Sequence, residues 1–172
     1  MAMSHAVQFY NDDVFLIGAV CSFIKAGYEQ NATPIIVATQ KHREDLHQTF
    51  QAWGNLNLMS KVVQFDAEEL LSTFMVDGWP NEAKFNASVG RIVAEAALRG
   101  PVHIYGEMVA VLWAEGKTRA AIRLEELWNE LASRHSFSLL CGYPISAFPN
   151  QETNESFHQV CQTHTHVHIP AS

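Results

Sequence analysis

Short apolar runs alternate with longer amphipathic segments along the whole chain. Five runs rich in branched and aromatic side chains predict β-strands at residues 5–10, 33–39, 61–66, 101–106 and 137–144. The segments between them repeat apolar residues at helical spacing and predict helices at 12–30, 41–54, 67–76, 81–100 and 117–135. Such alternation predicts an α/β domain of three layers, with a mostly parallel sheet flanked by helices.

No internal repeat or low-complexity linker divides the chain. We therefore expect one domain over residues 1–172, with a core from about 5 to 148 and a tail over 149–172. A polar joint, PNQETNES at 149–156, separates the two parts.

Composition and charge exclude several classes of partner. The 172 residues carry a formal charge of -7 and no visible basic patch, so a direct nucleic-acid or anionic-membrane partner is not expected. The apolar runs fall short of the roughly 20 residues that span a bilayer. Cys21, Cys141 and Cys161 are odd in number, and no leader is visible before them, so we expect a cytoplasmic protein.

The strand exits are the first place to look for a site, because parallel sheets bind ligands beyond the carboxyl ends of their strands. These exits are residues 10–13, 39–42, 66–69, 106–107 and 142–146. The first, YNDDVFL, has no glycine or lysine and carries Asp12 and Asp13. A phosphate-binding loop needs the opposite composition, so we do not expect ATP hydrolysis.

Two glutamates flank the apolar stretch 107–115, EMVAVLWAE. Glu107 directly follows a predicted strand, so it is a candidate pocket residue, a first-turn helix acid or a general base. If Glu107 is kept for binding, neutralising it should leave stability unchanged or raise it, whereas if Glu107 is only a structural partner, neutralising it should destabilise the fold by about 1–3 kcal/mol. Glu115 precedes a glycine and is expected at the helix end. If the stretch is helical, the two lie about 12 Å apart, too far to share a proton.

Two further groups are candidates. Glu125, Trp128 and Asn129 share one helical flank and form either a packing cluster or a ligand-binding set, which we would then expect to share a pocket with Glu107 and the exit of the first strand. In the tail, helical spacing aligns His158, Cys161 and His164, whereas strand spacing aligns His164, His166 and His168; either pattern could ligate Zn²⁺ or another transition metal, or simply face solvent.

Several segments taken together resemble a known family. HAVQFYNDDVFL, FMVDGWPNEAKF, GEMVAVLWAEG, RLEELWNELASRHSFSLLCGYP and FHQVCQTHTHV occur in order over residues 5–168 and resemble the MEDS family, the methanogen/methylotroph, DcmR-type sensory domain. The resemblance implies a divergent RecA/KaiC-like P-loop fold without a Walker A motif. It also implies a place beside sensor histidine kinases or transcription regulators and a role in sensing small molecules, for which hydrocarbon derivatives have been proposed.

The family pattern implies a set of ligand-binding positions and no catalytic one. The candidate ligand-binding residues are His5, Gln8, Tyr10, Asp12, Asp13, Glu107, Trp113, Glu125, Trp128 and Asn129. Phe9, Glu115, Cys161 and His164 also match the pattern.

We therefore expect a non-enzymatic, cofactor-free sensory domain that binds a small organic ligand. It would signal to a histidine kinase or transcription-regulator module in the same or another chain, and a homodimer is compatible with this role. The alternative is a metal- or redox-responsive sensor that uses His158, Cys161, His164 and His166.

Overall fold

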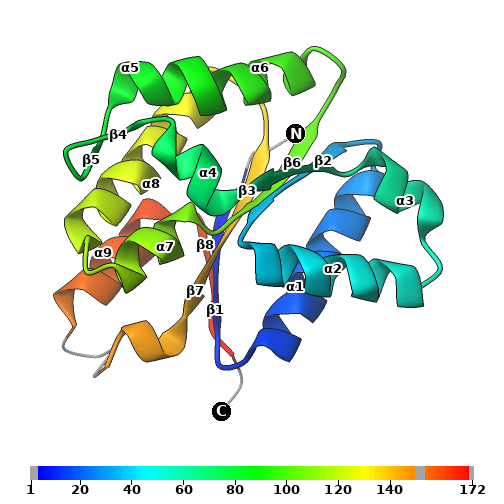
Figure 1. The fold of residues 1–172 in the computed structure, drawn as a ribbon, viewed down its shortest axis with the longest axis horizontal. Helices are drawn as coiled ribbons and strands as arrows, with labels where there is room; N and C mark the ends of the chain where they lie inside the picture. The colour runs from blue at the N-terminus through cyan, green and yellow to red at the C-terminus, as the bar shows by residue number, and fades with distance from the viewer. Residues whose placement is uncertain (1–3, 150–153, 171–172) are drawn as a thin grey trace.

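The structure, a computed structural model, describes residues 4–149 and 154–170. Six strands form one sheet in the order β3-β2-β6-β7-β1-β8, and every pairing within it is parallel (Figure 1). The strands are β1 (His5–Tyr10), β2 (Thr33–Ala38), β3 (Val63–Asp66), β6 (Val102–Gly106), β7 (Ser138–Pro144) and β8 (His166–His168). A separate antiparallel pair joins β4 (Met75–Val76) to β5 (Trp79–Pro80). The predicted parallel α/β architecture is confirmed.

Helices cover both faces of the sheet (Figure 1). On one face lie α1 (Asp13–Glu29), α2 (Gln40–Ala52) and α3 (Leu56–Lys61). On the other lie α4 (Ala67–Ser72), α5 (Glu82–Phe85), α6 (Arg91–Ala97), α7 (Met108–Ala114), α8 (Thr118–Ala132) and α9 (Glu155–Thr163). A π-helical turn, η1 (Asn86–Gly90), follows α5, and a 3₁₀ turn, η2 (Ile145–Ala147), follows β7.

Alternation along each strand divides the apolar residues between two cores. On β1, Val7 and Phe9 belong to the core beneath α7, α8 and α9, whereas Ala6 and Tyr10 belong to the core beneath α1 and α2. Successive side chains of a strand point to opposite faces, so a buried parallel strand must be apolar on both. The same rule places His5 on the Val7 face, opposite Tyr10.

All five predicted strands are present, and the differences lie in the helices. The segment predicted as one helix over 81–100 contains a π-helical turn, Asn86–Gly90, between α5 and α6. The helix predicted over 67–76 ends at Ser72, and a tight turn with positive φ at Asp77 and Gly78 then joins β4 to β5. Helix α3, which the pattern did not predict, follows Gly54.

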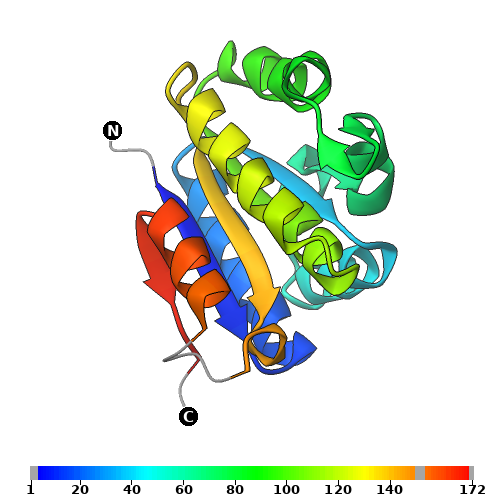
Figure 2. The ribbon, with the colours of Figure 1, turned by 90° about the vertical axis from the view of Figure 1, so that its left-hand side faces the viewer.

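The tail contributes directly to the sheet. Strand β8 pairs with β1 at the sheet edge, and α9 lies beside α8 over the sheet (Figure 2). The tail therefore contains both a helix, through His158 and Cys161, and a strand, from His166 to His168, but His164, which each pattern included, lies between them in neither. Residues 150–153 of the polar joint lie outside the described residues. Within the described part of the chain, no helix has the length and apolar character to cross a membrane.

Candidate functional site

Glu107 is buried at the point where β6 ends and α7 begins. Its backbone N–H donates to Val37 O on β2, which extends the strand ladder by one residue and turns the side chain toward the start of α2. The residue is only 3% exposed. Burying a carboxylate is unfavourable unless it is paired, so the surrounding donors decide its role.

Three donors occupy the two oxygens of Glu107. The backbone N–H of Thr39 donates to Oε1 at 2.6 Å, and the hydroxyl of Tyr105 donates to Oε2 at 2.6 Å. The imidazole Nδ1 of His42 lies 2.8 Å from Oε2. These contacts fix the carboxylate between β6 and α2 and compensate for its burial.

His42 continues this network to the protein surface. Its Nε2 lies 3.2 Å from Oδ1 of Asp13, whose other oxygen pairs with Lys41 Nζ at 2.8 Å. The hydrogen bond to Glu107 raises the pKa of His42 to about 9, so the ring carries a positive charge at neutral pH. The hydrogen bond from Lys41 lowers the pKa of Asp13.

A cavity of about 390 Å³ opens beside Glu107. We call it the strand-end pocket, and it is lined by Tyr10, Thr39, His42, Glu68, Glu107, Ala110, Val111, Ala114, Glu115 and Pro144. One wall is aliphatic and comes from α7 and the end of β7, while the other carries the imidazole and the carboxylates. Burial, reinforced by the charge of Glu107, raises the pKa of Tyr10 above its ordinary value, so its hydroxyl stays protonated.

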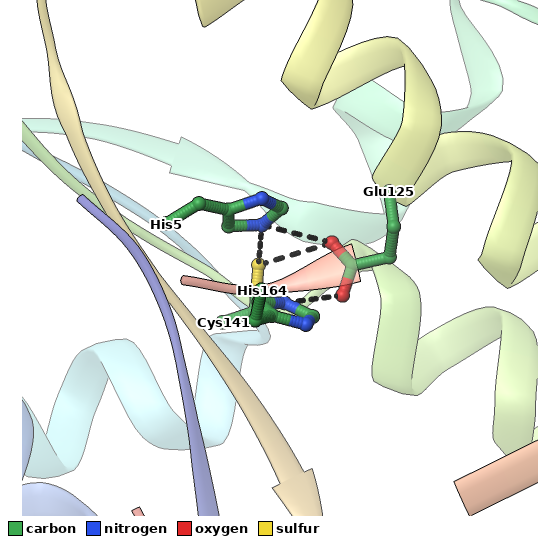
Figure 3. Close-up of side chains that lie close together, drawn as sticks. All are labelled: His5, Glu125, Cys141 and His164. Carbon is green, nitrogen blue, oxygen red and sulfur yellow. Dashed lines mark hydrogen bonds and ion pairs between the residues drawn. The ribbon is translucent and has the colours of Figure 1, made fainter. Parts of the chain in front are cut away.

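A second polar group lies away from this pocket, on the face of the sheet that α8 and α9 cover, between β1, β7, α8 and the end of α9 (Figure 3). It consists of His5, Glu125, Cys141 and His164, all buried, and we call it the buried cluster. One nitrogen, oxygen or sulfur atom from each residue lies within 4.8 Å of the others.

Short contacts join the members of the buried cluster. Glu125 Oε1 lies 3.2 Å from His5 Nε2 and 3.4 Å from Cys141 Sγ, and Glu125 Oε2 lies 2.7 Å from His164 Nε2. Cys141 Sγ is 3.5 Å from His5 Nε2. Tyr143 also donates its hydroxyl to Glu125 at 3.2 Å.

Burial and charge act against each other in the buried cluster. Burial acts to raise the pKa of Glu125, but His164 and His5 outweigh it and hold that pKa well below its usual range. Burial similarly acts to lower the pKa of His164, and the facing carboxylate raises it overall. Burial, with the negative charge of Glu125, raises the pKa of the Cys141 thiol, so it is protonated at neutral pH.

A sequence profile described as MEDS: MEthanogen/methylotroph, DcmR Sensory domain matches residues 4–165. The chain belongs to the MEDS family. The match spans both the strand-end pocket and the buried cluster, and the family is one of sensory domains. No curated protein and no solved structure gives a significant match to the chain.

In this MEDS domain, three of the ten candidate ligand-binding residues meet around the strand-end pocket. Tyr10 and Glu107 line it, and Asp13 contacts the lining residue His42. Glu115 lies at its exposed edge, where it caps the end of α7 and pairs with Lys117 at 3.0 Å.

Three other candidates lie in the buried cluster or beside it, and the structure does not bring them to Glu107. His5 and Glu125 belong to the cluster, and Asn129 contacts His5 at 2.8 Å. The expectation that Glu107 shares its pocket with the Glu125 flank is wrong, because Glu125 lies beneath α8 against His5 and Cys141, whereas the carboxylate of Glu107 contacts His42 on α2. Trp128 belongs to the apolar core, where it packs edge-to-face against Phe85.

The remaining three candidates have structural partners. Asp12 caps α1 by accepting a hydrogen bond from Phe15 N at 2.8 Å. The amide of Gln8 donates to backbone carbonyls, Phe9 O at 2.9 Å and His168 O at 3.4 Å. The indole of Trp113 donates to Ala147 O at 3.4 Å and packs edge-to-face against Tyr143.

The tail residues proposed as metal ligands do not converge. His164 joins the buried cluster, whereas His158 and Cys161 on α9 and His166 on β8 lie outside it. The set His158, Cys161, His164 and His166 is therefore not one ligand group within the described residues. A helix and a strand point their side chains in unrelated directions, so spacing within each could not bring these residues together.

His42, Thr39 and Cys141 are among the residues of the two sites that were not singled out from sequence. His42 and Thr39 lie at the carboxyl end of β2, where parallel sheets bind ligands, so their position in the sequence could have indicated both. Cys141 lies mid-strand, two positions before Tyr143, and only the alternation of β7 could place it on the Glu125 face.

Proposed function

We propose that this MEDS domain senses a small organic molecule that binds in the strand-end pocket. The observation that carries the proposal is a cavity of about 390 Å³ at the carboxyl ends of the strands, where a buried carboxylate and a charged imidazole adjoin an aliphatic wall. Ligand sites combine an apolar lining with a few fixed polar groups in this way.

The lining favours a neutral or cationic ligand. Glu68, Glu107 and Glu115 border the pocket, and His42 is the one basic side chain among its lining residues. An anionic ligand would face this excess of carboxylates, whereas an alcohol or amine could donate a hydrogen bond to them and lay its carbon skeleton on Ala110 and Val111. Such a ligand agrees with the proposed hydrocarbon derivatives.

We propose a binding role for Glu107 and no catalytic one. A general base needs an oxygen within reach of the substrate's proton. Both oxygens of Glu107 already accept hydrogen bonds from Thr39, His42 or Tyr105, so neither is without a protein partner and free to receive a substrate's proton. The network instead holds α2 against the end of β6.

That connection suggests how a ligand would produce a signal. The pocket is lined by the start of α2 and by α7, and Asp13 of α1 pairs with His42. A ligand that binds one arrangement of these helices better than another shifts the population toward it. We propose that a cytoplasmic histidine kinase or transcription-regulator module, in the same or another chain, responds to that shift. The divergent RecA/KaiC-like ancestry implied by the family resemblance is part of the same proposal.

Native mass spectrometry of protein purified from cells is the first test of the proposal. Thermal-shift measurements with a panel of short-chain alcohols, amines and carboxylates are the second. We expect a retained organic mass or a stabilising shift with neutral or cationic members. Ala110→Leu, which places a larger side chain on the pocket wall, should abolish the shift.

The matched control is Ala26→Leu, an exposed position on α1 far from the pocket lining, which should leave the shift intact. Binding that survives Ala110→Leu and Glu107→Gln unchanged would place the ligand elsewhere and refute the proposal.

A further inference from the structure

Both histidines of the buried cluster are held by their outer nitrogens. His5 Nδ1 lies 2.8 Å from Asn129 Oδ1, and the orientation of that amide is fixed because its Nδ2 donates to Thr163 O at 2.8 Å. His164 Nδ1 lies 2.6 Å from Val160 O. An acceptor next to Nδ1 requires Nδ1 to carry the proton. Each ring is thereby set to present Nε2 to the centre of the cluster.

This arrangement requires additional positive charge at the centre of the cluster. With Nδ1 protonated in both rings, a neutral imidazole offers a lone pair at Nε2, and both Nε2 atoms face the carboxylate of Glu125. Lone pairs facing a carboxylate repel it, so the cluster needs either two additional protons or one divalent cation among these atoms. Among the described residues, His164 Nε2 is a buried nitrogen without a hydrogen bond of normal geometry, although Glu125 Oε2 lies 2.7 Å away.

We propose that the buried cluster is a transition-metal site that binds Zn²⁺ or a similar divalent ion through His5 Nε2, His164 Nε2, Cys141 Sγ and a carboxylate oxygen of Glu125. Imidazole, thiolate and carboxylate are the donors that zinc takes in proteins. Bond lengths of about 2.0–2.3 Å in a tetrahedron separate neighbouring ligand atoms by about 3.3–3.8 Å. The contacts of 3.2, 3.4 and 3.5 Å among His5, Glu125 and Cys141 already match that spacing closely.

The surroundings also match a metal site. Ligating histidines usually donate their second N–H to a carbonyl or carboxylate, as His164 does to Val160 O and His5 to the amide oxygen of Asn129. Asn129 is thus a positioning residue for His5. Binding would form a metal–sulfur bond while the thiol proton of Cys141, and any proton on either Nε2, leaves to solvent.

Four protein ligands fill a tetrahedral shell, so the metal would have a structural or sensing role. The ligands come from β1, α8, β7 and the two-residue link between α9 and β8. Metal occupancy would therefore fix the C-terminal segment to the centre of the sheet. This site is separate from the strand-end pocket, and either could exist without the other.

Cobalt titration of the metal-free full chain tests the site. We expect one Co²⁺ per chain, visible d–d absorption of a tetrahedral ion and a near-ultraviolet sulfur-to-cobalt charge-transfer band, all displaced by Zn²⁺. Cys141→Ser should remove the charge-transfer band. Asn129→Ala should keep the band and weaken Zn²⁺ binding by about 10- to 100-fold, as loss of a group that orients a ligand does.

Cys161→Ser is the matched control, because Cys161 is the other cysteine near the C-terminus and lies outside the cluster. It should leave spectrum and stoichiometry unchanged. Loss of the band in Cys161→Ser but not in Cys141→Ser would overturn the site, as would the absence of stoichiometric binding. If Cys141→Ser does not fold, X-ray absorption of the cobalt-loaded wild type decides instead, because a shell without sulfur excludes the proposal.

Discussion

The hydroxyl of Tyr105 donates a 2.6 Å hydrogen bond to Glu107, two residues further along the same chain segment. The hydroxyl can lie there because the neighbouring strand carries a glycine. A Cβ atom on Gly142 would be 2.6 Å from it, closer than real Cβ contacts allow. The hydrogen bond that positions the Glu107 carboxylate therefore requires a residue without a side chain, Gly142, in β7.

Gly142→Ala should therefore destabilise the fold by about 1–3 kcal/mol, because the tyrosine must move and the core is already filled. Urea unfolding measures the change. Gly106→Ala is the control, since its Cβ would meet only Leu139 Cδ1 at an ordinary 3.9 Å and should change stability much less. Equal effects of the two substitutions would show that the contact with Tyr105 is unimportant.

Glu107→Gln should destabilise the protein by about 1–3 kcal/mol, because the amide group places its own N–H₂ among donors that require an acceptor. This reverses the expectation from sequence that neutralising Glu107 would leave stability unchanged or higher. The reason is the three donors around the carboxylate, which sequence did not reveal. Glu115→Gln, at an exposed ion pair, is the control and should change stability by less than about 0.5 kcal/mol. A melting temperature for Glu107→Gln at or above wild type would contradict this prediction.

His42 should make stability depend on pH. The pKa of its imidazole is raised to about 9 in the folded protein, against about 6.5 in an unfolded chain. The folded state therefore holds the proton more tightly, so the stabilisation is complete below about pH 6.5 and disappears as pH rises through about 9. Chemical denaturation at several pH values, compared with His42→Gln, isolates this contribution. The difference between the proteins should fall by about 1–3 kcal/mol across that interval, and a constant difference would rule out the pairing with Glu107.

Sequence patterns predicted the strands and the sheet type because both faces of a parallel sheet are buried, which leaves continuous apolar runs at positions such as 33–39. The patterns also identified Glu107 as a candidate, because it directly follows a predicted strand. They could not combine the candidates correctly, because the chain order of strands does not reveal which face a given helix covers. Both Glu125 and Glu107 were candidate pocket residues, but Glu125 lies on α8, whereas the side chain of Glu107, at the end of β6, contacts α2 on the other face of the sheet.

The buried cluster shows the same limit at larger separation. His5 and His164 both approach Glu125, although 159 positions separate them in the sequence. They meet because β8 pairs with β1, and Thr165 donates its backbone N–H to His5 O at 2.7 Å. Spacing within the tail could indicate ligand chemistry at His164. It could not identify partners on three other elements.

ATP should neither bind nor be hydrolysed at the junction of β1 and α1. A phosphate group binds where free backbone N–H groups at a helix start face it, with a lysine to balance its charge. Here the side chain of Asp12 already accepts from Phe15 N, and Asp13 adds a second negative charge. Lys41 approaches from α2, but it pairs with Asp13 and Asp45, at 2.8 and 3.2 Å. Addition of Mg²⁺-ATP should leave the melting temperature unchanged, because only a ligand that binds the folded state raises it. A saturable rise together with phosphate release that Glu107→Gln abolishes would instead identify Glu107 as a catalytic base and this domain as an enzyme.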